Sequence, residues 1–150
     1  TPCFLRQAGW PGMKEVVMQQ FALSLQRDLS LTVSRFLAIQ AMGSATAKSD
    51  AAALKQAIAA YPQASSVALS AGLAFLTNQD LRQSFAALSQ PVVGCFGALD
   101  SLVPLGAIAE LQRLQPGGQF NVLTKASHAP FISHRVEFLN WLNGWLTAAG

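Results

Sequence analysis

The sequence predicts an α/β fold in which a helical segment is followed by the βαβα end of a parallel sheet. Apolar residues recur with helical spacing through the first half of the 150-residue chain. In the second half, two short apolar runs bounded by turn residues flank a helical segment. A strand, a helix and a strand within about 35 residues form a βαβ unit, whose strands are parallel.

Two helices are predicted before residue 45. The first follows the turn at residues 10–12, and Val17 and Phe21 lie on its apolar face. We expect Asp28 to cap the N-terminus of the second helix, because a short carboxylate side chain accepts hydrogen bonds from free N–H groups of the first turn. Gly43 is the expected terminator of that helix.

Two further helices are predicted before the change of pattern near residue 78. Ser49 is the expected N-cap of the third helix, which runs over about 50–61 and stops at Pro62. The fourth helix spans about residues 64–77. No repeat period is evident in this half of the chain.

The second half predicts the sheet. Residues 91–96 and 120–123 are the two expected strands, and residues 105–114 form the helix between them. A turn is expected at 116–118, and a last helix at about 133–148. Parallel sheets are covered on both faces and normally have more than two strands. The chain therefore reads as a helical insertion followed by the end of a larger α/β fold.

Composition and charge exclude several classes of protein. Apolar residues make up 51% of the chain, which excludes disorder, and no stretch reaches the roughly 18 apolar residues of a membrane span. The net charge of +3 comes from scattered basic residues, so we expect neither a nucleic-acid partner nor a membrane partner. Only 11% of residues are charged, against about 25% in typical soluble domains. We therefore expect part of the surface to be covered by something outside this chain.

The cysteines and the N-terminus bear on the cellular compartment. Two cysteines without a C-x-x-C pattern are typical of a reducing compartment, and no signal peptide is visible, so we expect a cytoplasmic protein. The chain begins with Thr1 and not with Met, which is what a cut or truncated piece would show.

Asp100 and His128 are the candidate catalytic residues. Each follows one of the two predicted strands, and sites in open α/β sheets form beyond the carboxyl ends of the strands. Asp before His is the chain order of the last two members of an α/β-hydrolase triad, in which the carboxylate orients the imidazole that activates a nucleophile. The alternative is that Asp100 only caps a turn and His128 is an ordinary loop residue.

The sequence contains no G-x-S-x-G nucleophile motif. Its nearest imitation, residues 68–72 around Ser70, lies in a predicted helix with no strand before it. Thr1 could suggest an N-terminal nucleophile, although a cut chain explains it more simply. His134 is expected at the start of the last helix and Cys95 in the core; with no carboxylate cluster and no G-x-G-x-x-G, we expect no metal and no cofactor.

Several motifs carry a resemblance that covers essentially the whole chain. The sequence resembles the pimeloyl-[acyl-carrier protein] methyl ester esterases of biotin synthesis, which are α/β-hydrolases. The HAPFISH motif is specific to a subfamily, whereas G-x-x-D-x-x-V-P occurs across the superfamily. The segments that carry the resemblance are TPCF at 1–4, WPG at 10–12, RFLAIQ at 35–40, MG at 42–43, DLR at 80–82 and SHAPFISH at 127–134.

The resemblance implies the C-terminal portion of a serine carboxylesterase. Residues 1–77 would be the helical cap, or lid, with the segment that leads into it, and residues 78–150 the C-terminal part of the α/β-hydrolase core. A missing N-terminal portion of the same enzyme would hold the oxyanion hole and the nucleophilic Ser. The implied reaction is hydrolysis of the methyl ester of a pimeloyl chain carried on acyl carrier protein.

The resemblance also implies binding residues. The acyl pocket would be lined by Phe36, Leu37, Ala38, Ile39 and Gln40; plain cap core is the alternative for Phe36. The basic residues that would face the acidic acyl carrier protein are Arg35 and Lys48, for which a solvated helix face is the alternative. Leu31 and Ala52 stand where further Arg would be expected, so carrier affinity could be weaker or differently placed.

Two other functions remain open from the sequence. One is another α/β-hydrolase reaction, on a lactone, a short-chain ester or a C–C bond. The other is a non-catalytic helical interaction module, in which Asp100 and His128 would lie far apart or be exposed to solvent.

Overall fold

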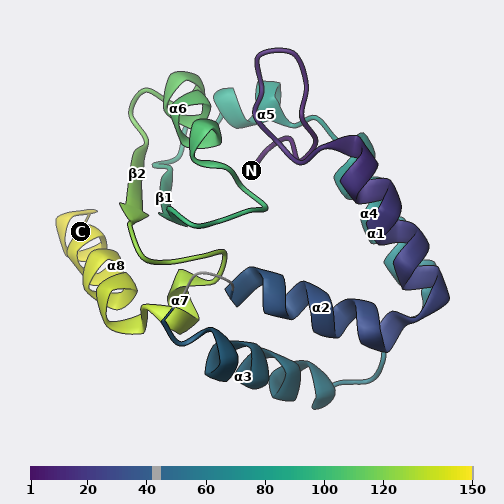
Figure 1. Cartoon of the computed structure of the whole chain (residues 1–150). Coiled ribbons are helices and arrows are strands. Elements are labelled where there is room, and N and C mark those ends of the chain that lie inside the picture. Colours follow the sequence, from purple (N-terminus) through teal and green to yellow (C-terminus); the bar gives the residue numbers. More distant parts are fainter. Residues whose placement is uncertain (42–44, 150) are drawn as a thin grey trace.

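A computed structural model describes residues 1–41 and 45–149, and Figure 1 shows the whole chain. Gly43, the expected terminator of the second helix, and the neighbouring Met42 lie outside the described residues. The elements in chain order are α1 (Glu15–Arg27), α2 (Leu29–Ala41), α3 (Ala47–Ala59), α4 (Ser66–Asn78), α5 (Arg82–Ala86), β1 (Val93–Gly97), α6 (Leu105–Leu114), β2 (Gln119–Leu123), α7 (Pro130–Ser133) and α8 (Arg135–Ala149).

The helices of the first half follow the sequence pattern closely. The predicted cap of α2 is confirmed, because the Leu31 N–H donates to the Asp28 carboxylate at 2.9 Å. The predicted cap of α3 is wrong. That helix begins at Ala47, and Ser49 lies inside its first turn, where its hydroxyl donates to the Thr46 carbonyl at 2.9 Å. Ala47 and Lys48 are good helix formers, so the helix extends further toward its N-terminus than the serine suggested.

Two short helices, α5 and α7, were not predicted. They are five and four residues long, too short for a 3.6-residue apolar period to show. Tertiary contacts stabilise α5 instead. The side-chain amide of Gln115, which follows α6, donates to the Phe85 carbonyl at 2.6 Å and so ties the end of α5 to α6.

The predicted βαβ unit is confirmed. β1 and β2 pair in parallel, with Val93 opposite Gln119 and Gly97 opposite Leu123. The crossover helix α6 has the predicted bounds. Because both strands run the same way, the loops that follow them emerge at the same edge of the sheet. In Figure 1 these loops face the end of α2, and α7 lies beside that end.

The segment before α1 packs on the sheet side of the molecule. It turns back on itself at Gly9, whose φ of +70° favours glycine, and Cys3 forms an antiparallel bridge with Asp80. Trp10 is 2% exposed, and its indole N–H donates to the Cys3 carbonyl at 2.8 Å. Cys3 and Trp10 form a buried cluster with Leu111 of α6, against which side chains of α5, β1 and β2 pack.

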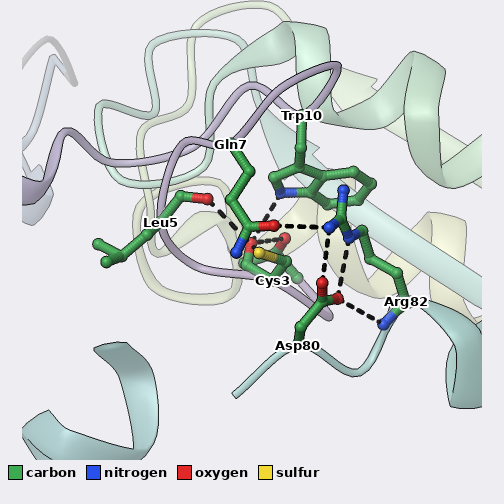
Figure 2. Close-up of polar contacts among 7 residues, drawn as sticks. Cys3, Leu5, Gln7, Trp10, Asp80 and Arg82 are labelled. Carbon is green, nitrogen blue, oxygen red and sulfur yellow. Dashed lines mark hydrogen bonds and ion pairs between the residues drawn. The ribbon is translucent and has the colours of Figure 1, made fainter. Parts of the chain in front are cut away.

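Arg82, the first residue of α5, connects the segment before α1 to α5 through side-chain hydrogen bonds, as Figure 2 shows. Its guanidinium bonds Asp80 through two nitrogens, at 2.8 and 2.6 Å, and donates to the Gln7 side-chain oxygen at 2.6 Å. The same group lies 5.6 Å from the centre of the Trp10 ring, within cation–π range. The hydrogen bonds from Arg82 lower the pKa of Asp80 from 3.8 to about 2.

The helical half of the chain (α1 to α4) leaves more of its apolar side chains exposed than the sheet half (α5 to α8 with β1 and β2). α1 packs beside α4, and α2 beside α3, as the ribbon also shows (Figure 1). No residue of α4 is buried, and Val67 and Phe75 on this helix are among the exposed large apolar side chains. Among the described residues, no helix is long and apolar enough to cross a membrane.

Candidate active site

Two loops form the candidate site, one after each strand. They are held together by backbone hydrogen bonds, from the Leu99 N–H to the Ala126 carbonyl at 2.9 Å and from the Ala98 N–H to the Leu123 carbonyl at 3.0 Å. Gly97, the last residue of β1, permits this close approach. A Cβ atom at this position would lie 2.0 Å from the Ser127 carbonyl oxygen, so only glycine fits without moving the backbone.

Asp100 is fixed from both sides of its carboxylate. Its Oδ1 accepts the backbone N–H groups of Leu102 at 2.8 Å and Val103 at 3.0 Å, which is an Asx turn. Its Oδ2 lies 2.9 Å from Nδ1 of His128. The side chain is only 5% exposed. Asp100 therefore caps a turn through Oδ1 and also contacts the imidazole of His128 through Oδ2.

The contact fixes the tautomer of His128. A carboxylate only accepts hydrogen bonds, so Nδ1 must donate the proton that the 2.9 Å contact requires. The neutral ring then carries its free lone pair on Nε2, where it can take a proton from a nucleophile. The side chain is 35% exposed, so the ring is partly open to an incoming group.

The backbone of His128 is held by the helical half of the chain. Its N–H donates to the carbonyl of Gln40, near the end of α2, at 3.2 Å. This contact was not predicted, because it joins backbone groups of two distant elements and leaves no pattern in the sequence. It places the end of α2 beside the candidate catalytic residue.

Comparison with known proteins finds esterases similar to this chain. The esterase of Aliivibrio fischeri (strain MJ11) is 42% identical over 146 residues, which are 97% of this chain and 57% of that protein. The counterpart from Klebsiella pneumoniae is 41% identical over 150 residues, which are 100% of this chain and 58% of that protein. Both are named "Pimeloyl-[acyl-carrier protein] methyl ester esterase". The chain is a homologue of these esterases.

This chain spans a little over half the length of the curated relatives it matches. No family model matches it. An esterase (EaEST) from Exiguobacterium antarcticum has the same fold over 98% of this chain and 54% of its own, with a TM-score of 0.81 and 18% sequence identity. The predicted fold class is thereby confirmed: the chain is part of an α/β-hydrolase fold.

The residues expected to bind the acyl chain lie on the last turns of α2, next to the candidate site. Leu37 is buried, while Ala38 and Ile39 are exposed. Phe36 is half-buried, and its ring centre lies 5.1 Å from that of Phe21 on α1, so it contributes to packing within the helical half. Gln40 is half-buried and supplies the carbonyl that holds His128. The acyl-binding role of these five residues stays a prediction.

The expected carrier-facing residues and the other candidates are also placed. Arg35 and Lys48 are both exposed. Ser70 lies within α4, where no strand-to-helix elbow exists. The Thr1 hydroxyl donates to the Cys3 carbonyl at 2.9 Å. His134 directly precedes α8, and its Nδ1 contacts the Ser133 hydroxyl at 2.9 Å.

Two further polar groups belong to the segments that form the site, the Cys95 thiol on β1 and the Ser127 hydroxyl next to His128. Burial raises the pKa of the Cys95 thiol, which disfavours the reactive thiolate. The hydroxyl of Ser127 is buried and meets no hydrogen-bond partner within the described residues. Nowhere in residues 1–41 and 45–149 is a group of three or more His, Cys, Asp or Glu side chains placed to hold a metal ion.

Proposed function

We propose that this chain supplies the Asp–His half of a Ser-His-Asp triad in a carboxylic ester hydrolase. The observation that carries the proposal is the 2.9 Å contact between Asp100 and Nδ1 of His128, on successive loops of an α/β-hydrolase fold. The substrate we propose is the methyl ester of a pimeloyl chain on acyl carrier protein, because the relatives at 41–42% identity are named for it.

In the proposed reaction His128 acts first as a base and then as an acid. Nε2 takes the proton of a serine hydroxyl supplied by a portion of the enzyme outside this chain, and the serine oxygen attacks the ester carbonyl. The tetrahedral intermediate collapses, and the imidazolium returns the proton to the departing methoxide, which leaves as methanol. Water then repeats the sequence on the acyl-enzyme and releases the free carboxylate. Asp100 stabilises the imidazolium at each stage.

The end of α2 is the proposed wall of the acyl site. Phe36 and Gln40 are four residues apart, so both lie on one face of the helix. The hydrogen bond from His128 to the Gln40 carbonyl supports this proposal, because it brings that end of the helix to the reacting group. Phe36 serves in packing against Phe21, and a pimeloyl chain would contact the part of its ring that remains exposed.

Arg35 and Lys48 are the proposed contacts for the acidic carrier protein. Both are exposed, so their side chains are free to meet an anionic surface. Charges at the rim of an interface act on docking and not on chemistry. Reversing both charges (Arg35→Glu with Lys48→Glu) should therefore slow hydrolysis of the carrier-bound ester and spare a small soluble ester. Equal loss on both substrates would contradict the assignment.

Two alternatives to the proposed function are tested differently. Another α/β-hydrolase reaction is distinguished from it by the substrate that is hydrolysed, and a non-catalytic interaction module by the distance between Asp100 and His128. Hydrolysis of a lactone, a short-chain ester or a C–C bond would use the same Asp and His, so only substrate profiling separates these from the proposed reaction. The non-catalytic module requires Asp100 and His128 to be far apart or exposed. The 5% exposure of Asp100 and its 2.9 Å contact do not favour that alternative.

The test is ester hydrolysis by the chain assembled with the rest of an esterase. The chain is co-expressed with the portion of the Aliivibrio fischeri esterase that lies outside the matched 146 residues, and the purified pair is assayed on the methyl ester of pimeloyl-acyl carrier protein. We expect turnover that His128→Ala abolishes. His134→Ala, at the other histidine, is the matched control and should retain it. Full activity of His128→Ala would overturn the proposal.

A further inference from the structure

One side chain contacts both segments that connect the helical half to the sheet half. These are the segment before α1 and the segment that follows α4. The guanidinium of Arg82 donates to the Gln7 side-chain oxygen in the first segment, at 2.6 Å. In the second segment it bonds both carboxylate oxygens of Asp80, at 2.8 and 2.6 Å (Figure 2). Because Arg82 is also the first residue of α5, three parts of the fold meet at its guanidinium.

The loop that Arg82 contacts leads directly into α1. This loop is closed by a hydrogen bond from the Arg6 N–H to the Met13 carbonyl at 2.8 Å, and α1 begins two residues after Met13. Arg82 contacts the loop through Gln7 and also through Trp10, whose ring centre lies 5.6 Å from the guanidinium carbon. A rotation of the loop would carry α1 with it, and the contacts of Arg82 oppose that rotation.

The exit from the helical half is equally short. α4 ends at Asn78, and Asp80, which Arg82 bonds, is only two positions further along the chain. The next residue ties this exit to the start of the chain, because the Leu81 N–H donates to the Pro2 carbonyl at 2.8 Å. The directions of α1 and α4 are therefore fixed at one junction.

The helical half meets the sheet half again beside the candidate base. There the His128 N–H donates to the Gln40 carbonyl at 3.2 Å, and α3 contacts α7. Figure 1 shows the helices as an arc between the two attachments, with α1 and α4 at the Arg82 junction and α2 and α3 beside α7. The 13 residues of α1 span about 20 Å, so a rotation of about 5° at the junction would move the far end of α1 by about 2 Å. Such a shift breaks a hydrogen bond that is already 3.2 Å long.

We propose that Arg82 is a positioning residue for His128. It acts through the helical half, by holding that half at the angle at which the Gln40 carbonyl reaches the backbone of His128. The catalytic consequence rests on the proposed function, in which His128 is the base, whereas the coupling of Arg82 to the Gln40–His128 hydrogen bond does not. The competing explanation is a purely local role, in which Arg82 stabilises the junction and nothing beyond it.

Amide hydrogen exchange in the chain alone tests the coupling, because the His128 amide reports its bond to Gln40 directly. Arg82→Met keeps an unbranched side chain and removes every side-chain donor. It should speed exchange at His128 about tenfold or more. The amides of Thr32 in α2 and Leu99 in the sheet half, which donate to backbone carbonyls within their own halves, should keep their rates. Their constancy shows that both halves stay folded.

Three further variants control for the loss of charge and of stability. Arg113→Met removes an arginine whose 2.8 Å ion pair stays within α6, so exchange at His128 should not change. Gln7→Met removes one acceptor and leaves the pair of Arg82 with Asp80 in place, so it should speed exchange at His128 by less than Arg82→Met does. Gln7→Glu supplies a carboxylate acceptor at the same position and should keep the wild-type rate. If Arg82→Met fails to fold, the two Gln7 variants decide the question.

The assembled enzyme separates positioning from stability. The chain is co-expressed with the portion of the Aliivibrio fischeri esterase outside the matched 146 residues, and the complex is assayed on a small soluble ester. Arg82→Met should lower kcat about tenfold and change KM less, because a misplacement of about 1 Å in catalytic geometry can cost about 10²-fold. Gln7→Glu should keep the wild-type kcat, and Gln7→Met should lie between the two.

Four results would overturn the positioning role. They are unchanged exchange at His128 in both Arg82→Met and Gln7→Met, equal acceleration at Thr32 and Leu99, acceleration by Arg113→Met as large as that by Arg82→Met, and an unchanged kcat for Arg82→Met in an active complex. If the wild-type complex hydrolyses no ester, then the proposed function is overturned, and the exchange rates of the chain alone still decide the coupling.

Discussion

Asp100 has two functions in the structure, and two substitutions should separate them. Oδ1 caps the turn by accepting two backbone N–H groups, while Oδ2 accepts the proton of His128 Nδ1. Asp100→Ala removes both functions. Asp100→Asn keeps an oxygen for the turn but places an amide nitrogen, which cannot accept a hydrogen bond, against His128.

The expected loss of stability follows from the turn. Leu102 and Val103 are buried residues, and Asp100→Ala leaves both of their N–H groups without an acceptor. An unsatisfied buried donor costs about 1–3 kcal/mol, so the free energy of unfolding should fall by about 2–6 kcal/mol. Asp100→Asn retains the acceptor and should cost less than about 1 kcal/mol. Urea denaturation of the purified chain measures both values.

The expected chemical effect follows from the imidazole. In Asp100→Asn the side-chain amide donates a hydrogen bond to Nδ1, so the ring proton moves to Nε2. Nε2 then has no free lone pair to accept the serine proton. Long-range ¹H–¹⁵N correlation spectra of the neutral ring report this change of tautomer in the chain alone. His134 in the same spectrum is the internal control and should not change. In the assembled enzyme the rate should fall about 10⁴-fold, by analogy with triads in which this carboxylate was replaced by an amide.

Either of two results would refute this reasoning. If Asp100→Asn lost as much stability as Asp100→Ala, then the turn would depend on the charge and not on an accepting oxygen. If the tautomer of His128 stayed the same in Asp100→Asn, then the 2.9 Å contact would not determine where the ring proton sits.

Three further predictions concern stability. Ser127→Ala should raise the free energy of unfolding by about 1 kcal/mol, because it removes a buried hydroxyl that has no hydrogen-bond partner among residues 1–41 and 45–149. A lower free energy of unfolding in urea denaturation would mean that the hydroxyl is hydrogen-bonded. Gly97→Ala should cost about 3 kcal/mol or prevent folding, because the new Cβ would lie 2.0 and 2.4 Å from backbone oxygens. Gly72→Ala in α4, where a Cβ would meet open space, should instead stabilise the chain by up to about 1 kcal/mol. Equal changes in melting temperature for the two variants would contradict this difference. The pair of Asp80 with Arg82 lowers the folded-state pKa of the Asp80 carboxyl from 3.8 to about 2, so its contribution to stability is complete above about pH 5 and is lost as the pH falls toward about 1. The stability difference between the wild type and Asp80→Asn should shrink as the pH falls through that interval and should be constant above it.

The sheet half of the fold was predictable because its signals are local. The two strands, the helix over 105–114 and their parallel pairing follow from short apolar runs, turn residues and one amphipathic segment. The pairing of Asp100 with His128 followed in turn, because the carboxyl ends of parallel strands meet at one edge. The geometry was thus accessible from the order of elements, without knowledge of any side-chain contact.

What the sequence could not predict depends on contacts between distant residues. Arg82 bonds Gln7 across 75 positions, and no period or motif links these two residues. The carbonyl of Gln40 holds His128 through the backbone, so the identity of neither side chain reveals the bond. Ser49 shows the opposite error, in which a correct local preference was outweighed by the helix formers before it.

The position of His128 joins the two halves of the chain. Its ring is oriented from the sheet side by Asp100, and its backbone is held from the helical side by Gln40. The distance from the reacting nitrogen of a catalytic imidazole to its partner can vary by only a few tenths of an ångström, because hydrogen-bond reach is about 2.6–3.2 Å. A shift of α2 would move the peptide of His128 while Asp100 kept the ring in place, so the loop would have to absorb the difference. Under the proposed function, α2 would therefore help to position the base through the Gln40 carbonyl, in addition to the part proposed for it in binding an acyl chain.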